Sequence, residues 1–351
     1  MSRLRGSAAS ASQGRLRGSA ASASAKASAD RSASQGRLRA AGASASAKAP
    51  ADRSASHGSA IQELSIERRP AMDVAIAAQL ACLLEATAVK PGNVSPGRPF
   101  DDLRYEDFLA GAVAIGAPLA AAGSQPLGVT IRTAIDATAR WTRSNTNLGI
   151  VLLLAPLARA ASQSGVAPSL RDEVRRVLAA TSVDDAREAY AAIRRAAPGG
   201  LGSVDDQDVA GEPTRTLLEV MRLAAGRDGV AREYATAYEL TFMTGAPALE
   251  RARRDGLSWQ DAIVETFLTL LAAAPDTHIA RRGGTAMADD VSRQARSTIA
   301  AGGVRSAAGR EAIERMDRGL RDARHIGNPG TTADLTAAAI FVALLGGAWV
   351  P

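Results

Sequence analysis

The chain contains very little cysteine and few aromatic residues. One of its 351 residues is cysteine and 3% are Phe, Trp or Tyr, whereas the hydrophobic set makes up 46%. A single cysteine excludes a disulfide within the chain and is typical of a reducing compartment. Cys82 lies in an apolar run, so we expect a small buried side chain and not a nucleophile. The apolar content therefore comes from Ala, Leu, Val and Ile, which favours closely packed helices.

The sequence also lacks long apolar runs. No stretch approaches the roughly 20 uninterrupted apolar residues of a membrane helix, and Met1 is not followed by the pattern of a signal peptide. We therefore expect a soluble, cytoplasmic protein with no membrane partner.

The excess of positive charge lies in the first 60 residues. The chain carries +6 overall, but residues 1–60 hold ten Lys or Arg and two acids, so the remainder carries −2. A nearly neutral remainder argues against nucleic-acid binding by the folded domain.

The N-terminal segment is repetitive. RLRGSAASAS occurs at residues 3–12 and again at 15–24. Because such a composition cannot bury enough apolar surface, we predict a disordered tail at 1–68 and a folded domain at 69–351. A transit peptide or an RNA-contacting arm is the functional alternative. The repetition, with Met72 just before the first helical pattern, favours a translation start downstream of Met1.

The folded domain is predicted to be all-α, a compact bundle of many helices with functional loops between them. Ser258 and Thr331 or Thr332 are expected helix caps. The expected helices are 74–89, 105–122, 129–141, 148–161, 170–180, 183–196, 214–225, 231–244, 258–274, 291–301, 309–323 and 332–345.

The first polar connection is Lys90-Pro-Gly-Asn93. Pro91 ends the preceding helix and Gly92 permits a positive φ, so the following amides are free to meet an anion. The alternative is a helix end and turn with no ligand.

The second is Asn145-Thr-Asn-Leu-Gly149, at the start of an apolar helix. Amides and the helix dipole favour phosphate there. The alternative is an ordinary N-cap made by Asn or Thr.

The third is the run from Pro275 to Gly284. Arg281 and Arg282 match phosphate oxygens, Gly283 and Gly284 let the backbone approach a ligand, and Asp276 could hold Mg²⁺ or orient a hydroxyl. The alternative is a solvated helix end.

The fourth opens the last helix, where Asp334 in the first turn, with Thr331 and Thr332, suits a metal or a ribose hydroxyl. A capping role is the alternative. A glycine-rich loop at 199–208 ends in Asp208, but it follows a helix and not a strand, which excludes a Rossmann or P-loop site.

Together, KPGNV, SNTNLG, GGLGxxDxxDV, DTHIARRGG and NPGTTADL, in this order, resemble the triphosphoribosyl-dephospho-CoA synthase family over residues 72–351. The resemblance implies an all-α enzyme that moves the triphosphoribosyl group of ATP onto a ribose hydroxyl of dephospho-CoA and releases adenine. The family's His-Lys pair is replaced here by Asn147-Leu148. This variant resembles relatives of tetrahydromethanopterin-type pathways, for which a different acceptor is expected.

On this basis we predict that Mg²⁺, Lys90, Arg281 and Arg282 hold the triphosphate and that Asp276 or Asp334 binds the metal. Catalysis is assigned to Glu85, Asp208 and Asp334, with Glu85 and Asp208 as candidate bases. The other residues predicted to contact the nucleotide are Gly92, Asn93, Asn145, Thr146, Asn147, Gly149, Gly283, Gly284 and Thr332.

Two other functions remain open. One is a Mg²⁺-dependent N-glycosidase or ribosyl transferase of a tetrahydromethanopterin-type pathway, and the other is a non-catalytic helical nucleotide-binding module. A homodimer is compatible with either.

Overall fold

The computed structural model describes residues 69–163, 167–322 and 324–349, and the tail predicted at 1–68 lies outside them. Apart from one isolated bridge between Ser95 and Arg98, the described residues contain no β-pairing, which confirms the all-α prediction. Their α-helices are α1 Ala71–Thr87, α2 Tyr105–Ala114, α3 Gly116–Ala120, α4 Leu127–Thr138, α5 Leu148–Ser162, α6 Leu170–Ala179, α7 Val183–Ala196, α8 Leu217–Ala224, α9 Gly229–Thr236, α10 Ala246–Arg254, α11 Trp259–Ala273, α12 Thr277–Gly283, α13 Thr285–Ala300, α14 Ala307–Leu320 and α15 Gly330–Leu345.

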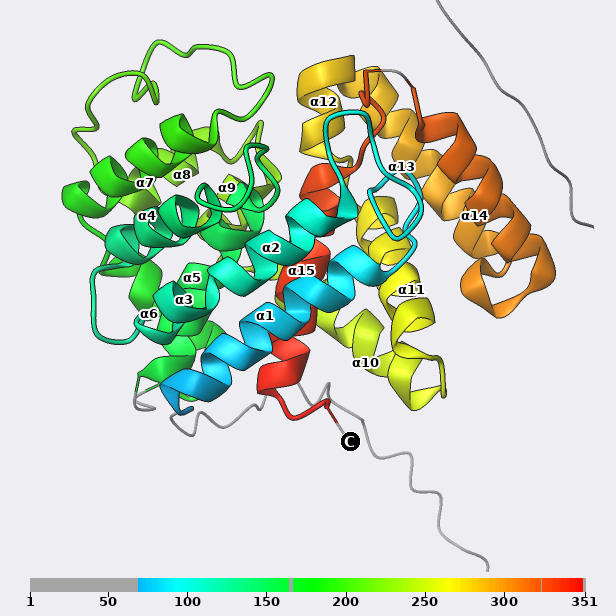
Figure 1. The fold of residues 1–351 in the computed structure, drawn as a ribbon, viewed down its shortest axis with the longest axis horizontal. Helices are drawn as coiled ribbons and strands as arrows, with labels where there is room; N and C mark the ends of the chain where they lie inside the picture. The colour runs from blue at the N-terminus through cyan, green and yellow to red at the C-terminus, as the bar shows by residue number, and fades with distance from the viewer. Residues whose placement is uncertain (1–68, 164–166, 323, 350–351) are drawn as a thin grey trace, which may run out of the picture. The chain divides into compact units, whose positions relative to one another are not determined.

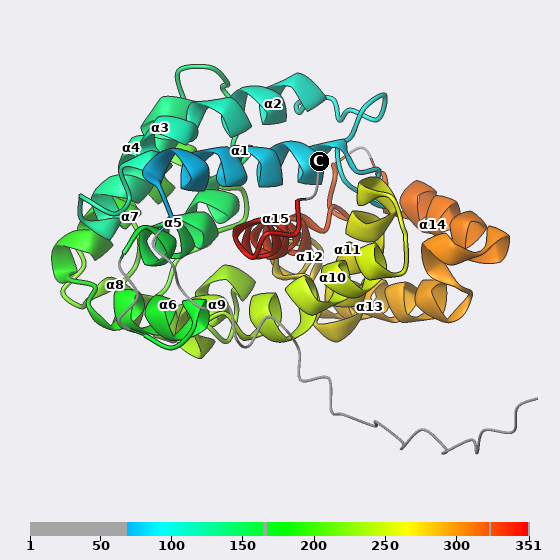
Figure 2. The ribbon, with the colours of Figure 1, turned by 90° about the horizontal axis from the view of Figure 1, so that it is seen from below.

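Helix α15 forms the centre of the helical unit. Figure 2 shows it almost end-on, with α1, α5 and α11 packed around it. Every residue from Leu335 to Leu345 is buried, as expected for a helix that is apolar on all sides. None of the described helices combines the length and apolarity that crossing a membrane requires.

Most helix starts follow from local sequence. The Ser258 hydroxyl accepts the Asp261 amide, as predicted, and Ser182 forms a reciprocal capping box with Asp185. The predicted cap of the last helix was wrong. Helix α15 begins at Gly330, so Thr331 and Thr332 lie inside its first turn.

Three predicted segments differ from the structure. The helix expected at 231–244 ends at Thr236, because Ala237 and Tyr238 adopt a positive φ. The amides of both residues donate to the Glu233 carbonyl, which ends the regular helical pattern. A five-residue π-helix, Thr241–Gly245, then leads into α10. The sequence pattern predicts neither the π-helix nor α10. The connection expected at 275–285 contains a further helix, α12, and the helix expected at 105–122 is divided between α2 and α3.

Pro156 inside α5 explains a long-range contact. A proline has no amide hydrogen, so it leaves the carbonyl four residues earlier without its helical donor. That carbonyl, on Leu152, accepts the hydroxyl of the buried Tyr234 at 2.6 Å. The proline that weakens α5 therefore joins it to α9.

The turn after α1 is fixed by a buried carboxylate on α14. Asp317 accepts the Gly92 amide at 2.8 Å, Arg98 Nη1 at 2.9 Å and Arg321 Nε at 3.0 Å. Gly92 has φ +76°, and a Cβ there would lie 3.0 Å from Leu320 and Pro329. Glycine is therefore required by conformation and by close packing. Figure 1 shows this turn as the cyan loop leading from α1 to α2.

We predict that Asp317→Ala lowers the free energy of unfolding by about 3 kcal/mol, because two arginines and a buried amide lose their partner. Urea unfolding followed by circular dichroism would measure this change. Glu314→Ala is the control, since Glu314 also pairs with Arg98 but its side chain is 47% exposed. That variant should change stability by less than about 1 kcal/mol, and equal losses in both would contradict the anchoring role of Asp317.

Candidate active site

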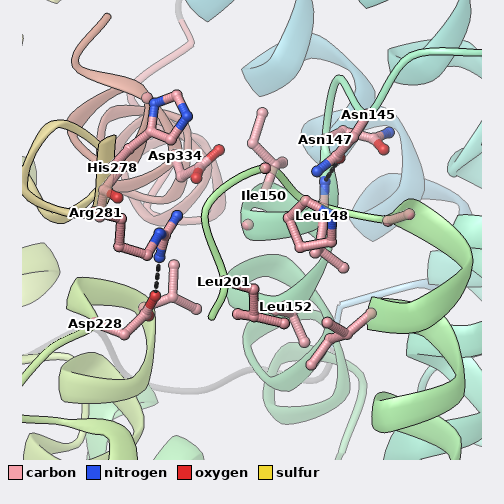
Figure 3. A pocket seen from close by; sticks show the side chains of 18 of the residues that line it. Asn145, Asn147, Leu148, Ile150, Leu152, Leu201, Asp228, His278, Arg281 and Asp334 are labelled. Carbon is pink, nitrogen blue, oxygen red and sulfur yellow. Dashed lines mark hydrogen bonds and ion pairs between the residues drawn. The ribbon is translucent and has the colours of Figure 1, made fainter. Parts of the chain in front are cut away.

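A cavity of about 610 Å³ opens where several helix ends meet. Its walls come from the end of α1 and the turn after it, the loop before α5, helices α7 to α9, α12 and the start of α15. Figure 3 shows ionisable side chains on one side, among them Asp334, His278 and Arg281, and aliphatic side chains such as Leu152 and Leu201 elsewhere. The cavity therefore offers a polar region and an apolar region to one ligand.

Three helix N-termini contribute to the polar region. Gly149 and Ile150 of α5, Val230 of α9 and Thr331 of α15 line the cavity, and their amides have no acceptor among the described residues. First-turn amides lack partners within their own helix, and the dipoles favour negative charge at this end. Their convergence suits a polyanion.

Asp334 is the fifth residue of α15, just beyond the first turn in which the sequence predicted it, and it lies against the start of α5. A Cβ at Gly149 would come within 2.0 Å of Asp334 Oδ2, so only glycine leaves space for the carboxyl group. Within the described part of the chain, its oxygens have no hydrogen-bond partner. Burial raises the pKa of Asp334 well above its ordinary 3.8, the carboxylates of Glu85, Asp276 and Asp228 raise it further, and Arg281 opposes them.

Glu85 and Lys90 form a buried ion pair beside Asp334. Lys90 is fully buried, and its Nζ lies 2.9 Å from Glu85 Oε1 and 3.1 Å from the Ala88 carbonyl, with a further bond to the Glu85 carbonyl. Glu85 lines the cavity, whereas Lys90 does not. Lys90, predicted to hold the triphosphate, is thus placed behind the cavity wall, where its three donors are already used.

Arg281 belongs to α12 and pairs with Asp228, the N-cap of α9. Both residues line the cavity, and the Arg281 Nε atom is buried without a partner among the described residues. Arg282 also lines it, but donates to the carbonyls of Arg324 and His325 at 2.5 and 3.0 Å. Arg281 is thus the better placed of the two for a phosphate.

His278 is a residue that the predicted site list omitted. Its Nδ1 lies 3.0 Å from the Asn328 carbonyl, which can only accept, so Nδ1 carries the hydrogen. Burial lowers its pKa, and a Cβ on Gly330 would approach Nδ1 to 2.7 Å. The sequence did offer a signal for this site residue: His278 is one of three histidines in the chain and lies close to two arginines. The sequence signal for Asp228 was weaker, since it is only an acid directly before a helix that begins with glycine.

The loop before α5 brings three predicted residues to the cavity. Asn145 Oδ1 accepts the amide of Leu148, the first residue of α5, while Asn147 Nδ2 donates to Thr138 at 3.0 Å. Thr146 Oγ1 and, from the turn after α1, Asn93 Oδ1 are buried without partners among the described residues. Such atoms favour a ligand that supplies the missing hydrogen bonds.

Asp276 and Thr332 lie outside the cavity wall. Asp276 is buried, and its oxygens accept the amide of Ile279 and both the amide and the hydroxyl of Thr332. These bonds join α12 to α15, so the carboxylate is enclosed and supports the site from behind. Asp276, predicted to bind a metal, is therefore placed away from the cavity wall.

Four further predicted residues also have structural roles. Asp208 accepts the amides of Val204 and Ala210, which lower its pKa and shape its own loop. Gly92 bonds to Asp317, and Gly283 and Gly284 form the close junction of α12 and α13. None of these four lines the cavity. Among the described residues, no three Asp, Glu, His or Cys side chains gather into a metal site of their own.

Comparison with known proteins gives one consistent family. A family model described as ATP:dephospho-CoA triphosphoribosyl transferase matches residues 71–350. Two curated proteins named "Probable 2-(5''-triphosphoribosyl)-3'-dephosphocoenzyme-A synthase" are similar to the chain. The protein from Pseudomonas paraeruginosa is 30% identical over 37% of this chain and 45% of its own, and that from Pseudomonas putida is 28% identical over 47% and 57%. The chain thus matches about half the length of these curated relatives.

A solved structure is similar as well. The structure titled "Crystal structure of putative triphosphoribosyl-dephospho-coA synthase from Archaeoglobus fulgidus" aligns with a TM-score of 0.54 and 25% identity. The alignment covers 68% of this chain and 99% of that one.

We predict that Asp334→Asn stabilises the protein at neutral pH, by an amount that grows as the pH rises from about 4. A carboxyl with a raised pKa keeps its proton in the folded state above pH 3.8, while the unfolded state loses it. Stability of the natural protein therefore falls with rising pH through this group, and asparagine removes that fall. Urea unfolding at pH 5, 6, 7 and 8 tests it. Asp290→Asn, at an exposed carboxyl with a lowered pKa, should show no such rise.

Proposed function

The chain belongs to the ATP:dephospho-CoA triphosphoribosyl transferase family, and from this premise we propose that it transfers the 5-triphosphoribosyl group of ATP to a ribose hydroxyl of dephospho-CoA and releases adenine. The observation that carries the proposal is the cavity where three helix N-termini, Arg281 and the unpaired carboxyl of Asp334 meet. The single free cysteine favours a cytoplasmic setting.

The polar region suits the triphosphate. Donors of fixed geometry come from the guanidinium of Arg281 and from first-turn amides of α5, α9 and α15 that meet no acceptor in the described part of the chain. They replace the cation that the family's His-Lys pair would provide, because Asn147-Leu148 carries no charge here. Preorganised donors cost little reorganisation when the anion arrives.

Two carboxyl groups divide the proton transfers. Asp334, whose pKa is raised, is suited to donate a proton to the departing adenine. Glu85, whose charge is paired with Lys90, is suited to accept the proton of the attacking hydroxyl. The step breaks the C1′–N9 bond of ATP and forms a C1′–O bond. Asp208, the other base predicted from sequence, is used in its own loop and takes no part.

The site fits a Mg²⁺ ion that arrives with the triphosphate better than one held by protein alone. Mg²⁺ in nucleotide sites typically has one or two carboxylates plus phosphate oxygens. Asp228 and Asp334 are carboxyl groups on the cavity wall near Arg281, whereas Asp276 is enclosed. Bound Mg²⁺ would spread the negative charge of the triphosphate, and Asp228 is the side chain we assign to it.

We expect Asp334→Asn to lower turnover by about 10²–10⁴-fold, because the acid of the glycosyl step is lost. The assay incubates the full chain with Mg-ATP and dephospho-CoA and quantifies free adenine and coupled product by mass spectrometry. Asp290→Asn on the exposed face of α13 should leave both unchanged. Near-normal turnover of Asp334→Asn would remove this residue from the chemistry. Adenine release that requires another acceptor would keep the reaction and change the substrate.

Arg281→Lys should weaken binding of inorganic triphosphate in Mg²⁺ by about tenfold, because lysine keeps the charge but loses the planar fork. Titration calorimetry measures this directly. Arg293→Lys is the matched control, since Arg293 is exposed and pairs with Asp290 outside the cavity. An affinity equal to that of the natural protein in Arg281→Lys would place the triphosphate elsewhere.

A further inference from the structure

The apolar region of the cavity is closed on one side by residues 198–203, here called the cap segment. It follows α7, and Pro198, Gly199 and Leu201 line the cavity. Figure 3 draws Leu201 near Leu152 and below the carboxyl group of Asp334. The Leu201 side chain is 43% exposed although it borders a cavity. A large aliphatic side chain in this position leaves apolar surface that a ligand could cover.

The cap segment is anchored at both ends but has few bonds along its length. Backbone groups of residues 199–203 form no hydrogen bond with the described residues. Just beyond, Tyr190 donates to the Gln207 carbonyl at 2.5 Å and Arg194 to the Val209 carbonyl at 2.7 Å, which fixes the loop to α7. Loosely bonded backbone next to a fixed anchor is able to move at low cost.

Two glycines give the cap segment its course. Gly200 and Gly202 have φ of +75° and +68°, which other residues rarely adopt. A Cβ at Gly200 would lie 3.5 Å from Arg282 Cγ and 3.6 Å from the Arg281 carbonyl. The segment therefore reaches from α7 to α12 and spans the two sides of the cavity.

Several other parts of the cavity wall are aliphatic. Leu152 of α5, Val220 and Met221 of α8 and Val230 of α9 line the cavity. The guanidinium of Arg281, which lines the cavity from α12, would hold the anionic part of a nucleotide. An uncharged flat ring is the part that aliphatic walls bind best, since burying it removes apolar surface from water.

We propose that Leu201 closes over the purine ring of the bound nucleotide and keeps water away from the reacting ribose. This inference rests on the proposed function and names the part of the substrate that the apolar region holds. In the productive reaction the acceptor hydroxyl attacks C1′ as adenine leaves. If water reaches C1′ instead, its oxygen forms the new bond, its proton goes to the base, and free triphosphoribose results.

The first test distinguishes binding of the purine ring from binding of the phosphates. Leu201→Ala should weaken Mg-ATP binding by about tenfold, as expected for lost apolar contact, and should leave inorganic triphosphate binding unchanged. Leu223→Ala is the matched control, because Leu223 is 44% exposed and does not line the cavity. Equal affinity of Leu201→Ala and Leu223→Ala for Mg-ATP would overturn the proposal, as would equal weakening for ATP and triphosphate.

The second test follows the fate of the ribose. With Mg-ATP and dephospho-CoA, Leu201→Ala should release several times more adenine per coupled product than the natural protein or Leu223→Ala. If Leu201→Ala turns over normally and its ratio of adenine to coupled product is unchanged, the proposed role of Leu201 is overturned while the proposed function stands. If the natural protein neither binds Mg-ATP nor releases adenine, the proposed function itself fails.

Discussion

The burial of helix α15 is the constraint on which the site depends. Because its residues from Leu335 to Leu345 are enclosed on all sides, the helix has one position in the fold, and its first turn must emerge among the ends of its neighbours. Asp276, the N-cap residue of α12, holds that end in place by accepting the amide and the hydroxyl of Thr332 on α15. The carboxyl group of Asp334 is then carried against Gly149 at the start of α5. Core packing thus determines which polar groups meet in the cavity.

Much of the fold could be predicted because its signals are local. Alanine-rich periodicity, caps such as Ser182 and Ser258, and breaks at Pro91 each act within a few residues. The failures occurred where distant groups decide. Buried Glu233 accepts the amides of Leu240 and Thr241, and so ends α9 in a segment whose own pattern is helical. Helix α12 was missed because its cap, Asp276, was interpreted as a ligand.

The loops that form the candidate site could be predicted from the sequence. Which residues of those loops line the cavity and which support it from behind could not. Neighbouring residues of one motif face opposite ways: Asp276 is enclosed while His278 lines the cavity. The amide of Gly92 bonds to Asp317, which lies 225 residues away in sequence. No spacing rule reports such contacts, because they depend on how helices far apart in the chain pack. Whether a polar side chain supports the site or lines it is therefore a tertiary property.

The placement of Lys90 shows how one fold gives two carboxyl groups different chemistry. Glu85 and Asp334 both line the cavity, and the charge of Glu85 raises the pKa of Asp334. Two carboxylates close together and partly buried are costly to ionise at once. Lys90 forms its ion pair with Glu85, whereas burial and the neighbouring carboxylates raise the pKa of Asp334. In the reaction that we propose, this pairing leaves Glu85 as the base and Asp334 as the acid, and a glycosyl transfer with two proton movements requires such a pair.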